Sequence, residues 1–309
     1  MQRLKTILRS PWILRARWEE RRLARTLRHE LAVCAIFREE APFLDEWLRF
    51  HEGVGVTQFY LYDNFSTDGF RGVLAPWIAR GVVTLHDWPR QVGQFSAYRH
   101  CVRRYRRDAR WIAFIDLDEF LFSPQRQDIR PILARFAGRP GVAVNELFFG
   151  SAGHDAPPPG PIVEAYAKRA ALDFVLRTPF LLKDRAADRN DDASYLPLGC
   201  FVKTIANPRL IRAIRSPHAF KYWQGEAVTT DGAPLDGGHA PAMAIDLLRI
   251  NHYWSRSLSD LRTKVARGDA STSAKRDLAW HLEFESRLNA EEDRTIVPIA
   301  AAIRGASSP

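Results

Sequence analysis

Three acidic residues, Asp116, Asp118 and Glu119, follow an apolar run in the segment WIAFIDLDEFLF, residues 111–122. If this segment is a strand, Asp116 and Asp118 lie on one face, while Glu119 points away from them and orients them. Two carboxylates this close raise each other's pKa unless a cation neutralises them. A hard divalent ion, Mg2+ or Mn2+, suits oxygen ligands and substrate phosphates. The spacing therefore predicts a metal–phosphate site. The alternative is that the acids cap the next element or pair with arginines.

The elements that must position these acids alternate along the chain. Strand patterns occur in four segments, ELAVCAIF, TQFYLYD, VVTLHDW and WIAFIDLDEF. Helix patterns lie between them, in EAPFLDEWLRFHEGVG, STDGFRGVLAPWIARG and QFSAYRHCVRRYRRDA. This alternation predicts βαβ units, an α/β fold and a parallel sheet. Each strand ends in polar residues, and ligands bind at the carboxyl ends of such strands, so the four ends predict a polar cleft.

The later part of the chain is less regular. Strand patterns recur in GVAVNELFF, CFVKTIA and LLRINHYW, and SLSDLRTKVARGDA begins a helical region. We therefore expect three parts. These are a basic helical N-terminal extension (residues 1–29), a catalytic domain (residues 30–255), and C-terminal helices with a tail (residues 256–309).

Composition limits the class of protein. The 309 residues are 46% hydrophobic and 26% charged, as in ordinary globular proteins. No apolar run is long enough to span a membrane, and the N-terminus lacks the pattern of a secretory signal. The three cysteines have no CxxC spacing, which argues against a disulfide framework or a zinc site and indicates a reducing compartment. We expect a cytoplasmic protein.

The net charge of +9 suits an anionic partner: a nucleic acid, an acidic membrane surface or a phosphorylated substrate. Much of the excess lies in residues 1–30 and in RHCVRRYRRDAR, residues 99–110. The first stretch mixes arginines with apolar residues, which predicts peripheral contact with anionic lipid at the inner face of a membrane. A basic helix packed on its own domain is the alternative there. For the second stretch the alternative is a solvated helix face.

Three functions compete for these features. The first is a metal-dependent glycosyltransferase of the GT-A type, in which a DxD motif holds the metal and diphosphate. The second is a phosphatase with an aspartate nucleophile, but Phe120 stands where its motif requires Thr or Val, and three βα units precede the acids. The third is a non-catalytic basic scaffold or nucleic-acid-binding protein. No known nucleic-acid-binding signature supports it, so no specific nucleic-acid partner is expected.

The segment AVCAIFREEAPFLDEWLRFHEGVGVTQFYLYDNFSTDG, followed by WIAFIDLDEFLF, resembles bacterial glycosyltransferase family 2-like proteins related to family 92. The likeness continues in NELFFGSAGH, FVKTIANP and INHYWSRSLSDLRTKVARG, and spans roughly residues 31–290. The resemblance implies a GT-A fold with a mostly parallel central sheet flanked by helices. It also implies a nucleotide-diphosphate-sugar donor, with a UDP-sugar favoured, and a divalent cofactor, Mn2+ or Mg2+.

The resemblance also assigns residues. Asp118 and His252 would bind the metal, and Asp116 would contact the ribose or sugar of the donor. The remaining donor-binding residues implied are Ala35, Ile36, Phe37 and Glu39 along the nucleotide, Asp63 at the base or ribose, and Gln94 and Arg99 on the helix before the DxD motif. The assignment of Lys203 rests on the sequence pattern alone. Its side chain could reach a phosphate of the donor, or it could be a surface lysine.

The implied reaction transfers a hexose to a hydroxyl group of a glycan or glycolipid. It would invert the configuration at the anomeric carbon of the sugar. The resemblance to this family implies a role for the enzyme in the synthesis of cell-surface polysaccharide or lipopolysaccharide. An inverting enzyme needs a carboxylate that takes the proton of the hydroxyl. The pattern does not separate the candidates for this base, which are Glu146, Asp191, Asp192, Glu226 and Asp231.

Overall fold

The computed structural model describes residues 26–177, 195–235, 238–268 and 277–306. The predicted extension at residues 1–29 lies almost entirely outside these ranges, as do two candidate bases, Asp191 and Asp192. Among the described residues, no helix is long and apolar enough to cross a membrane.

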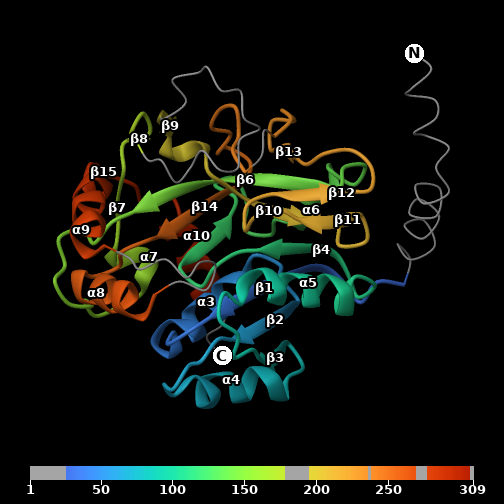
Figure 1. The fold of residues 1–309 in the computed structure, drawn as a ribbon, viewed down its shortest axis with the longest axis horizontal. Coiled ribbons are helices and arrows are strands. Elements are labelled where there is room, and N and C mark those ends of the chain that lie inside the picture. Colours follow the sequence, from blue (N-terminus) through green and yellow to red (C-terminus); the bar gives the residue numbers. More distant parts are fainter. Residues whose placement is uncertain (1–25, 178–194, 236–237, 269–276, 307–309) are drawn as a thin grey trace.

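The first half of the chain forms a parallel sheet with the order β3-β2-β1-β4 (Figure 1). Its strands are β1 (His29–Phe37), β2 (Gln58–Asp63), β3 (Val83–Asp87) and β4 (Ala109–Phe114). Three helices connect them: α3 (Ala41–Gly53), α4 (Phe70–Ala79) and α5 (Gln94–Tyr105). The predicted strand–helix alternation is confirmed.

The second half of the chain extends the same sheet. Strand β10 (Val202–Ala206) lies antiparallel between β4 and β6 (Gly141–Phe149). Strand β14 (Arg249–Tyr253) pairs in parallel with β6 and antiparallel with β5 (Glu119–Phe122). The other strands are β7 (Lys168–Arg169), β13 (Val228–Thr229) and β15 (Glu291–Glu292) in this sheet, and the separate pairs β8 (Val175–Arg177) with β9 (Tyr195–Pro197) and β11 (Ile211–Ile214) with β12 (Phe220–Tyr222). The prediction of an α/β fold with a mostly parallel central sheet is confirmed.

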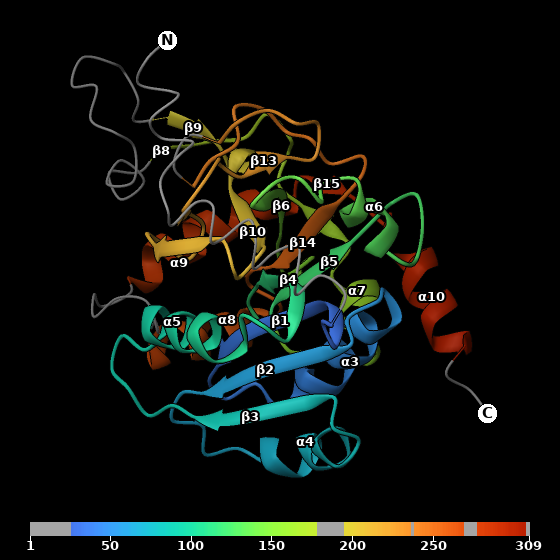
Figure 2. The ribbon, with the colours of Figure 1, turned by 90° about the vertical axis from the view of Figure 1, so that its right-hand side faces the viewer.

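Alternating residues of β1 enter two different cores, so the sheet has helices on both faces. Leu31, Val33 and Ala35 pack with α3 and α4, whereas Ala32 and Cys34 pack with α5. Figure 2 shows α5 and α3 on opposite sides of the parallel strands. Because side chains alternate along a strand, a fully buried strand such as β1 must be apolar on both faces, as its sequence is.

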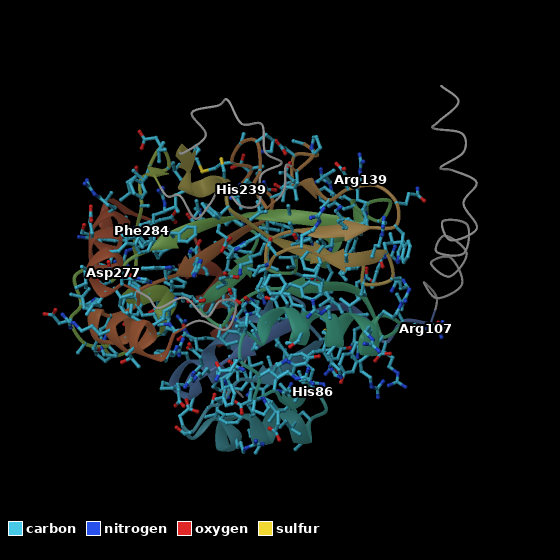
Figure 3. The ribbon with its side chains drawn as sticks, viewed as in Figure 1. His86, Arg107, Arg139, His239, Asp277 and Phe284 are labelled. Carbon is cyan, nitrogen blue, oxygen red and sulfur yellow. The ribbon has the colours of Figure 1, made fainter. Side chains whose placement is uncertain are left out.

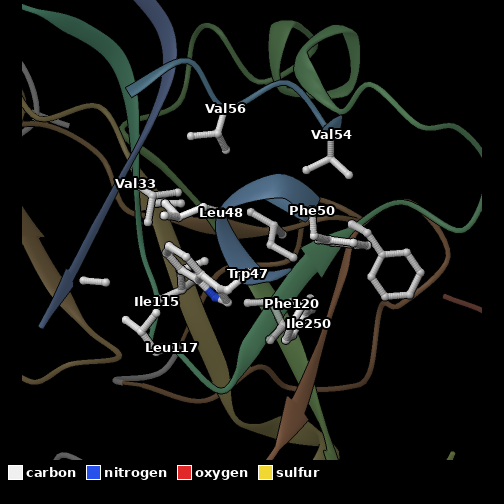
Figure 4. Packing of buried hydrophobic residues seen from close by; sticks show 14 of the residues in the cluster. Val33, Trp47, Leu48, Phe50, Val54, Val56, Ile115, Leu117, Phe120 and Ile250 are labelled. Carbon is white, nitrogen blue, oxygen red and sulfur yellow. The ribbon is translucent and has the colours of Figure 1, made fainter. Parts of the chain in front are cut away.

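The larger core surrounds Trp47 of α3 (Figure 4). Leu48 and Phe50 of the same helix pack there with Ile115 and Phe120, and each of these side chains is buried. Burying a side chain of this size stabilises the fold by roughly 1.5–3 kcal/mol. Ile115 and Phe120 flank the acidic residues, so this core fixes the backbone that carries them.

The expectation of one continuous strand through residues 111–120 is wrong. Strand β4 ends at Phe114, and Asp116 and Asp118 lie in a turn that is closed by the Glu119 N–H donating to the carbonyl oxygen of Asp116 (3.2 Å). After the turn, β5 leaves β4 and pairs with β14 instead. A turn, not strand alternation, therefore brings the two aspartates together.

The C-terminal helices pack on the same body. The remaining described helices are α6 (Arg130–Ala134), α7 (Ile162–Ala165), α8 (Leu258–Arg267), α9 (Leu278–Ser286) and α10 (Val297–Ala306), with short 3-10 turns at Leu198–Cys200 and Arg287–Asn289. Ser257 and Asp260 form a capping box at the start of α8. Ile303 of α10 lies against Gly53, where any Cβ would clash with it.

Candidate functional site

Three long-range hydrogen bonds fix the acidic turn. The indole N–H of Trp47 donates to the carbonyl oxygen of Glu119 (2.8 Å), and the N–H of Leu121 donates to Nε2 of His51 (3.2 Å). From the other side, the N–H of Tyr253 donates to the carbonyl oxygen of Asp118 (2.7 Å). Helix α3 and strand β14 therefore hold the backbone of the turn and of β5 between them.

Asp118, Glu119 and His252 form a cluster that can bind a metal ion. Glu119 and His252 are directly opposite each other in the antiparallel pair β5–β14, so their side chains share a face. One ligand atom from each of the three residues lies within 4.8 Å of the others. The sequence predicted Asp118 and His252. It wrongly predicted that Glu119 points away: its Oε2 accepts the N–H of Asp116 (3.0 Å).

His252 is oriented by carboxylates on both sides. Its Nδ1 lies 3.1 Å from Oε1 of Glu146, and its Nε2 lies 3.5 Å from Oδ2 of Asp118. Burial alone would lower the pKa of His252, but Asp118, Glu146 and Glu119 raise it to about 10. A carboxylate behind one ring nitrogen fixes the other nitrogen toward a metal in many metal sites. In this site, Glu146 is the carboxylate behind Nδ1 of His252, and Nε2 of the same ring faces Asp118.

The donor set of this cluster suits Mn2+ or Mg2+. It offers carboxylate oxygens and one imidazole nitrogen, without thiolate ligands. Oε1 of Glu119 and Oε2 of Glu146 are buried, with Nζ of Lys203 3.1 Å from the first and Nδ1 of His218 3.6 Å from the second. Because a carboxylate oxygen has more than one lone pair, both retain acceptor capacity that a cation would use. Burial raises the pKa of Glu119 well above its usual value, an effect that a bound cation would reverse. The residues present therefore fit a divalent ion.

Two lysines already compensate the acids. Nζ of Lys203 lies 2.6 Å from Oδ2 of Asp116 and 3.1 Å from Oε1 of Glu119, and the residue is only 2% exposed. The alternative that Lys203 is a surface lysine is therefore wrong. Nζ of Lys264, on α8, lies 2.5 Å from Oδ2 of Asp118. Burial alone would raise the pKa of Asp118, but Lys264 and His252 hold it well below its usual value.

Sequence reasoning missed Lys264 and the arginines beside it. A small cavity of about 40 Å³ lies between the start of α3 and α8, with Asp118, Lys264 and Trp254 among its lining residues. On its rim, Glu40 accepts from Arg256 (2.7 Å) and Arg267 (2.5 Å). The only available signal was the spacing of basic residues in RTKVARG on the predicted helix, which equally describes a solvated face. The cavity is far smaller than a nucleotide sugar.

The predicted donor-binding residues divide into two groups. Gln94, at the first turn of α5, donates to Oδ1 of Asp116 (3.1 Å) and so belongs to the site. Arg99 is exposed on the same helix, and five residues of helical rotation turn it away from Gln94. The others lie at the ends of β1 and β2.

At these strand ends the side chains mainly hold the backbone. Ala35 and Phe37 are buried in the core below the sheet. Glu39 has a positive φ of 54° and accepts the N–H of Thr67 (2.8 Å). Asp63 accepts the N–H of Ser66 (2.9 Å) and is also buried. Of these four residues, Glu39 lines the small cavity beside Asp118, and the other three are buried.

Among the candidate bases, Glu146 lies at the cluster. It is 1% exposed, and although burial would raise its pKa, hydrogen bonds from His218 and His252 lower the pKa well below the usual value. A carboxylate of this kind suits the support of His252 better than proton abstraction. Glu226 and Asp231 are exposed and flank β13, which pairs with the beginning of β6, away from Glu146.

Comparison with known proteins gives a consistent result. The family model "Glycosyltransferase family 92" matches residues 29–227. A glycosyltransferase family 92 protein of Oryza sativa subsp. japonica is 34% identical over 147 residues, which is 46% of this chain and 25% of that relative. A galactan β-1,4-galactosyltransferase of Arabidopsis thaliana is 34% identical over 99 residues, 28% of this chain and 19% of that protein. Both are plant proteins, so they do not support the bacterial origin that the resemblance implied.

A likeness to solved structures is weaker. The crystal structure of Staphylococcus aureus TarS in complex with UDP aligns with a TM-score of 0.34 and 11% identity, covering 42% of this chain and 38% of that one. The chain spans only about a quarter of the length of the first curated relative that it matches. The family model, in contrast, covers more than half of this chain, including the acidic turn, Lys203 and Glu146. The chain therefore belongs to glycosyltransferase family 92.

Proposed function

We propose that this protein is a metal-dependent glycosyltransferase that moves a sugar from a nucleotide-diphosphate sugar to a hydroxyl group. The observation that carries the proposal is the cluster of Asp118, Glu119 and His252, with Asp116 in the same turn. The turn lies at the carboxyl ends of four parallel strands, where ligands of open α/β sheets bind. Membership of family 92 supports the same reaction class.

The chain's own residues would divide the work. Asp118 and His252, with Glu119, would hold the divalent ion, and Glu146 would keep the ring of His252 in place. The ion would neutralise the charge that develops on the departing diphosphate. Asp116, held by Gln94 and Lys203, would accept hydrogen bonds from the ribose or sugar of the donor. These roles require a donor that lies along the ends of β1 and β4.

The proposed donor and acceptor rest on resemblance to other proteins. A UDP-sugar is the donor that the resemblance described under the sequence favours, and a hexose is proposed because the similar Arabidopsis protein is a galactosyltransferase. A glycan or glycolipid hydroxyl is the proposed acceptor, with inversion at the sugar. None of the described base candidates is both exposed and next to the cluster.

An Asp118→Asn variant tests the metal site. The substitution keeps the shape of the side chain but removes the charge that a divalent ion needs. We expect metal-dependent hydrolysis of UDP-sugars to fall by roughly 100-fold or more, because a metal supplies several kcal/mol of charge stabilisation. Hydrolysis would be measured with Mn2+ and with Mg2+, across UDP-, GDP- and dTDP-sugars, before and after EDTA.

Asp87→Asn is the matched control, because Asp87 also ends a parallel strand but pairs with Arg71 at the surface. It should keep full hydrolysis. Thermal shift with each nucleotide sugar and Mn2+ gives a second measurement, since a ligand that binds the folded chain raises the Tm. Full activity in Asp118→Asn, or no effect of EDTA, would rule out the metal; a Tm unchanged by every nucleotide sugar would rule out the donor.

We also propose that the protein works in the cytoplasm against an anionic membrane surface. The predicted N-terminal contact lies outside the described residues, but α5 and the β11–β12 hairpin supply a second basic surface. We call this the arginine face; its exposed members are Arg99, Arg103, Arg104, Arg107, Arg212, Arg215 and Lys221. Helix α5 contacts β11, so the two parts are adjacent. Arg107 marks this end of the molecule in Figure 3.

A further inference from the structure

An aromatic cluster extends from the candidate site to the surface of α9. Trp254 stacks on His281 (ring centroids 5.3 Å apart) and meets the edge of Phe284 (4.8 Å). Trp280 stacks on Phe284, with an angle of 15° between the ring planes and 5.3 Å between the ring centroids. Figure 3 shows Phe284 at α9, at the opposite end of the molecule from Arg107.

The inner end of the cluster touches the residues of the site. Trp254 lines the same small cavity as Asp118, and its carbonyl oxygen accepts from Lys264 (2.9 Å). Nζ of Lys264 also lies 5.5 Å from the centre of the Trp254 ring. Phe148 bridges the two regions, at 4.8 Å from His252 and 6.4 Å from Phe284. The cluster therefore packs, through buried and half-buried rings, against the residues of the proposed metal site.

The outer end of the cluster is open to solvent. Trp280 is 39% exposed, and Leu278 on the same helix is exposed to the same extent. Phe284 covers one face of the indole and His281 contacts the ring at 5.0 Å, and with respect to the described residues the rest of the ring is exposed. Glu283, one helical turn after Trp280, is exposed and can accept hydrogen bonds. A large aromatic ring beside a polar acceptor presents an apolar face and a hydrogen-bonding edge together.

This combination fits a pyranose ring. A pyranose carries C–H groups on one face, whose partial positive charge suits the negative face of an indole, and hydroxyl groups around its edge. The proposed donor lies along β1, β4 and Gln94, whereas α9 approaches the cluster from the side of His252. Figure 1 shows α5 and α9 on different sides of β14. A sugar on Trp280 would therefore belong to the acceptor.

We propose that Trp280, with Phe284 behind it and Glu283 beside it, is an acceptor-binding subsite that holds a sugar ring of a glycan chain. The subsite rests on the proposed glycosyl transfer, because only then does a glycan enter from this side. It would position the chain a few sugar units from the reacting hydroxyl. Trp280 would act on acceptor affinity and leave the reaction of the donor with water unchanged.

The test compares Trp280→Ala with Trp223→Ala, a tryptophan that is 40% exposed just after β12. Binding to an array of gluco-, manno- and β-1,4-galacto-oligosaccharides would be measured first, so that no acceptor has to be known. We expect at least one class to bind the unmodified protein. Trp280→Ala should weaken that binding about tenfold, as loss of a stacked aromatic contact does, and Trp223→Ala should not.

Hydrolysis of the UDP-sugar separates this subsite from the proposed function. Trp280→Ala should keep the hydrolysis rate and the Tm of the unmodified protein, and Trp280→Phe should recover most of the glycan binding. If no glycan binds, or if Trp280→Ala binds glycans as tightly as the unmodified protein, the subsite is wrong whatever the hydrolysis shows. If the unmodified protein hydrolyses no nucleotide sugar, the proposed function fails instead.

Discussion

At the scale of single residues, the site carries its own positive charges. Lys203 and Lys264 lie against Asp116 and Asp118, and His252 lies between Asp118 and Glu146. Buried acids are costly unless they are paired, so these cations allow several carboxylates to gather without a metal. The described charges are therefore compensated by the chain's own residues, and the proposed ion would bind to an arrangement that is already formed.

Lys203→Met tests this role. The methionine fills a similar volume but leaves Asp116 and Glu119 without their shared cation. Breaking a buried pair by removing one partner costs about 3 kcal/mol or more, so the free energy of unfolding should fall by about that amount. Urea unfolding would measure it. Lys221→Met, an exposed lysine on β12, should change it by less than about 0.5 kcal/mol. A loss below about 1 kcal/mol for Lys203→Met would contradict the pairing.

At the scale of elements, α3 and β5 form one unit. His51 is fully buried, and its Nδ1 donates to the carbonyl oxygen of Trp47 (2.8 Å) while Nε2 accepts from Leu121. Acceptance at Nε2 needs the neutral ring, and donation from Nδ1 places the proton of that ring on Nδ1. Burial lowers the pKa of His51 from 6.5 to about 3. The helix thus holds β5 through a group that must stay uncharged.

Acid should therefore weaken this unit. Between pH 6.5 and about 3 the unfolded chain binds a proton at His51 and the folded chain does not. The free energy of unfolding should fall as the pH drops through this window, by up to about 1.4 kcal/mol per pH unit from His51 alone. Comparing denaturant unfolding of His51→Gln and the unmodified protein at several pH values isolates this contribution. Equal pH slopes for the two proteins would show that His51 is not held neutral.

The sequence predicted the elements better than it predicted the side-chain contacts. The four strands and the intervening helices follow from periodicity, which depends on local patterns alone, but the end of the fourth strand at Phe114 does not. The position of Glu119 does not, because β5 leaves the preceding strand to pair with β14, a partner far away in the chain. Lys203 and Lys264 were equally hard to assign, since their role depends on which carboxylates the fold brings to them.

At the scale of the whole molecule, charge and aromatic surface lie at opposite ends. The arginine face lies at α5 and the β11–β12 hairpin, and the aromatic cluster lies at α9 (Figure 3). A protein that rests on an anionic membrane through the arginine face would keep α9 away from the lipid. A glycan could then reach Trp280 from the solvent side.

Charge reversal tests the orientation. In Arg103→Glu/Arg104→Glu, binding to phosphatidylglycerol vesicles should weaken by roughly 2 kcal/mol or more, because each basic residue near an anionic surface contributes about 1 kcal/mol. Vesicle co-sedimentation at low salt would measure it, and binding should fall as salt rises. Arg287→Glu/Arg294→Glu, beyond α9, changes the net charge equally and should bind far better. Equal binding by the two double variants would refute the arginine face.

The position of β14 has a consequence for how the chain becomes an ordered protein. The match to the family model ends at residue 227, whereas β14 lies between β5 and β6, and Lys264 reaches Asp118 across 146 positions of sequence. During synthesis, the turn that carries the acids emerges long before the strand and lysine that complete it. Until then β5 and β6 present open edges, which invite association with other chains.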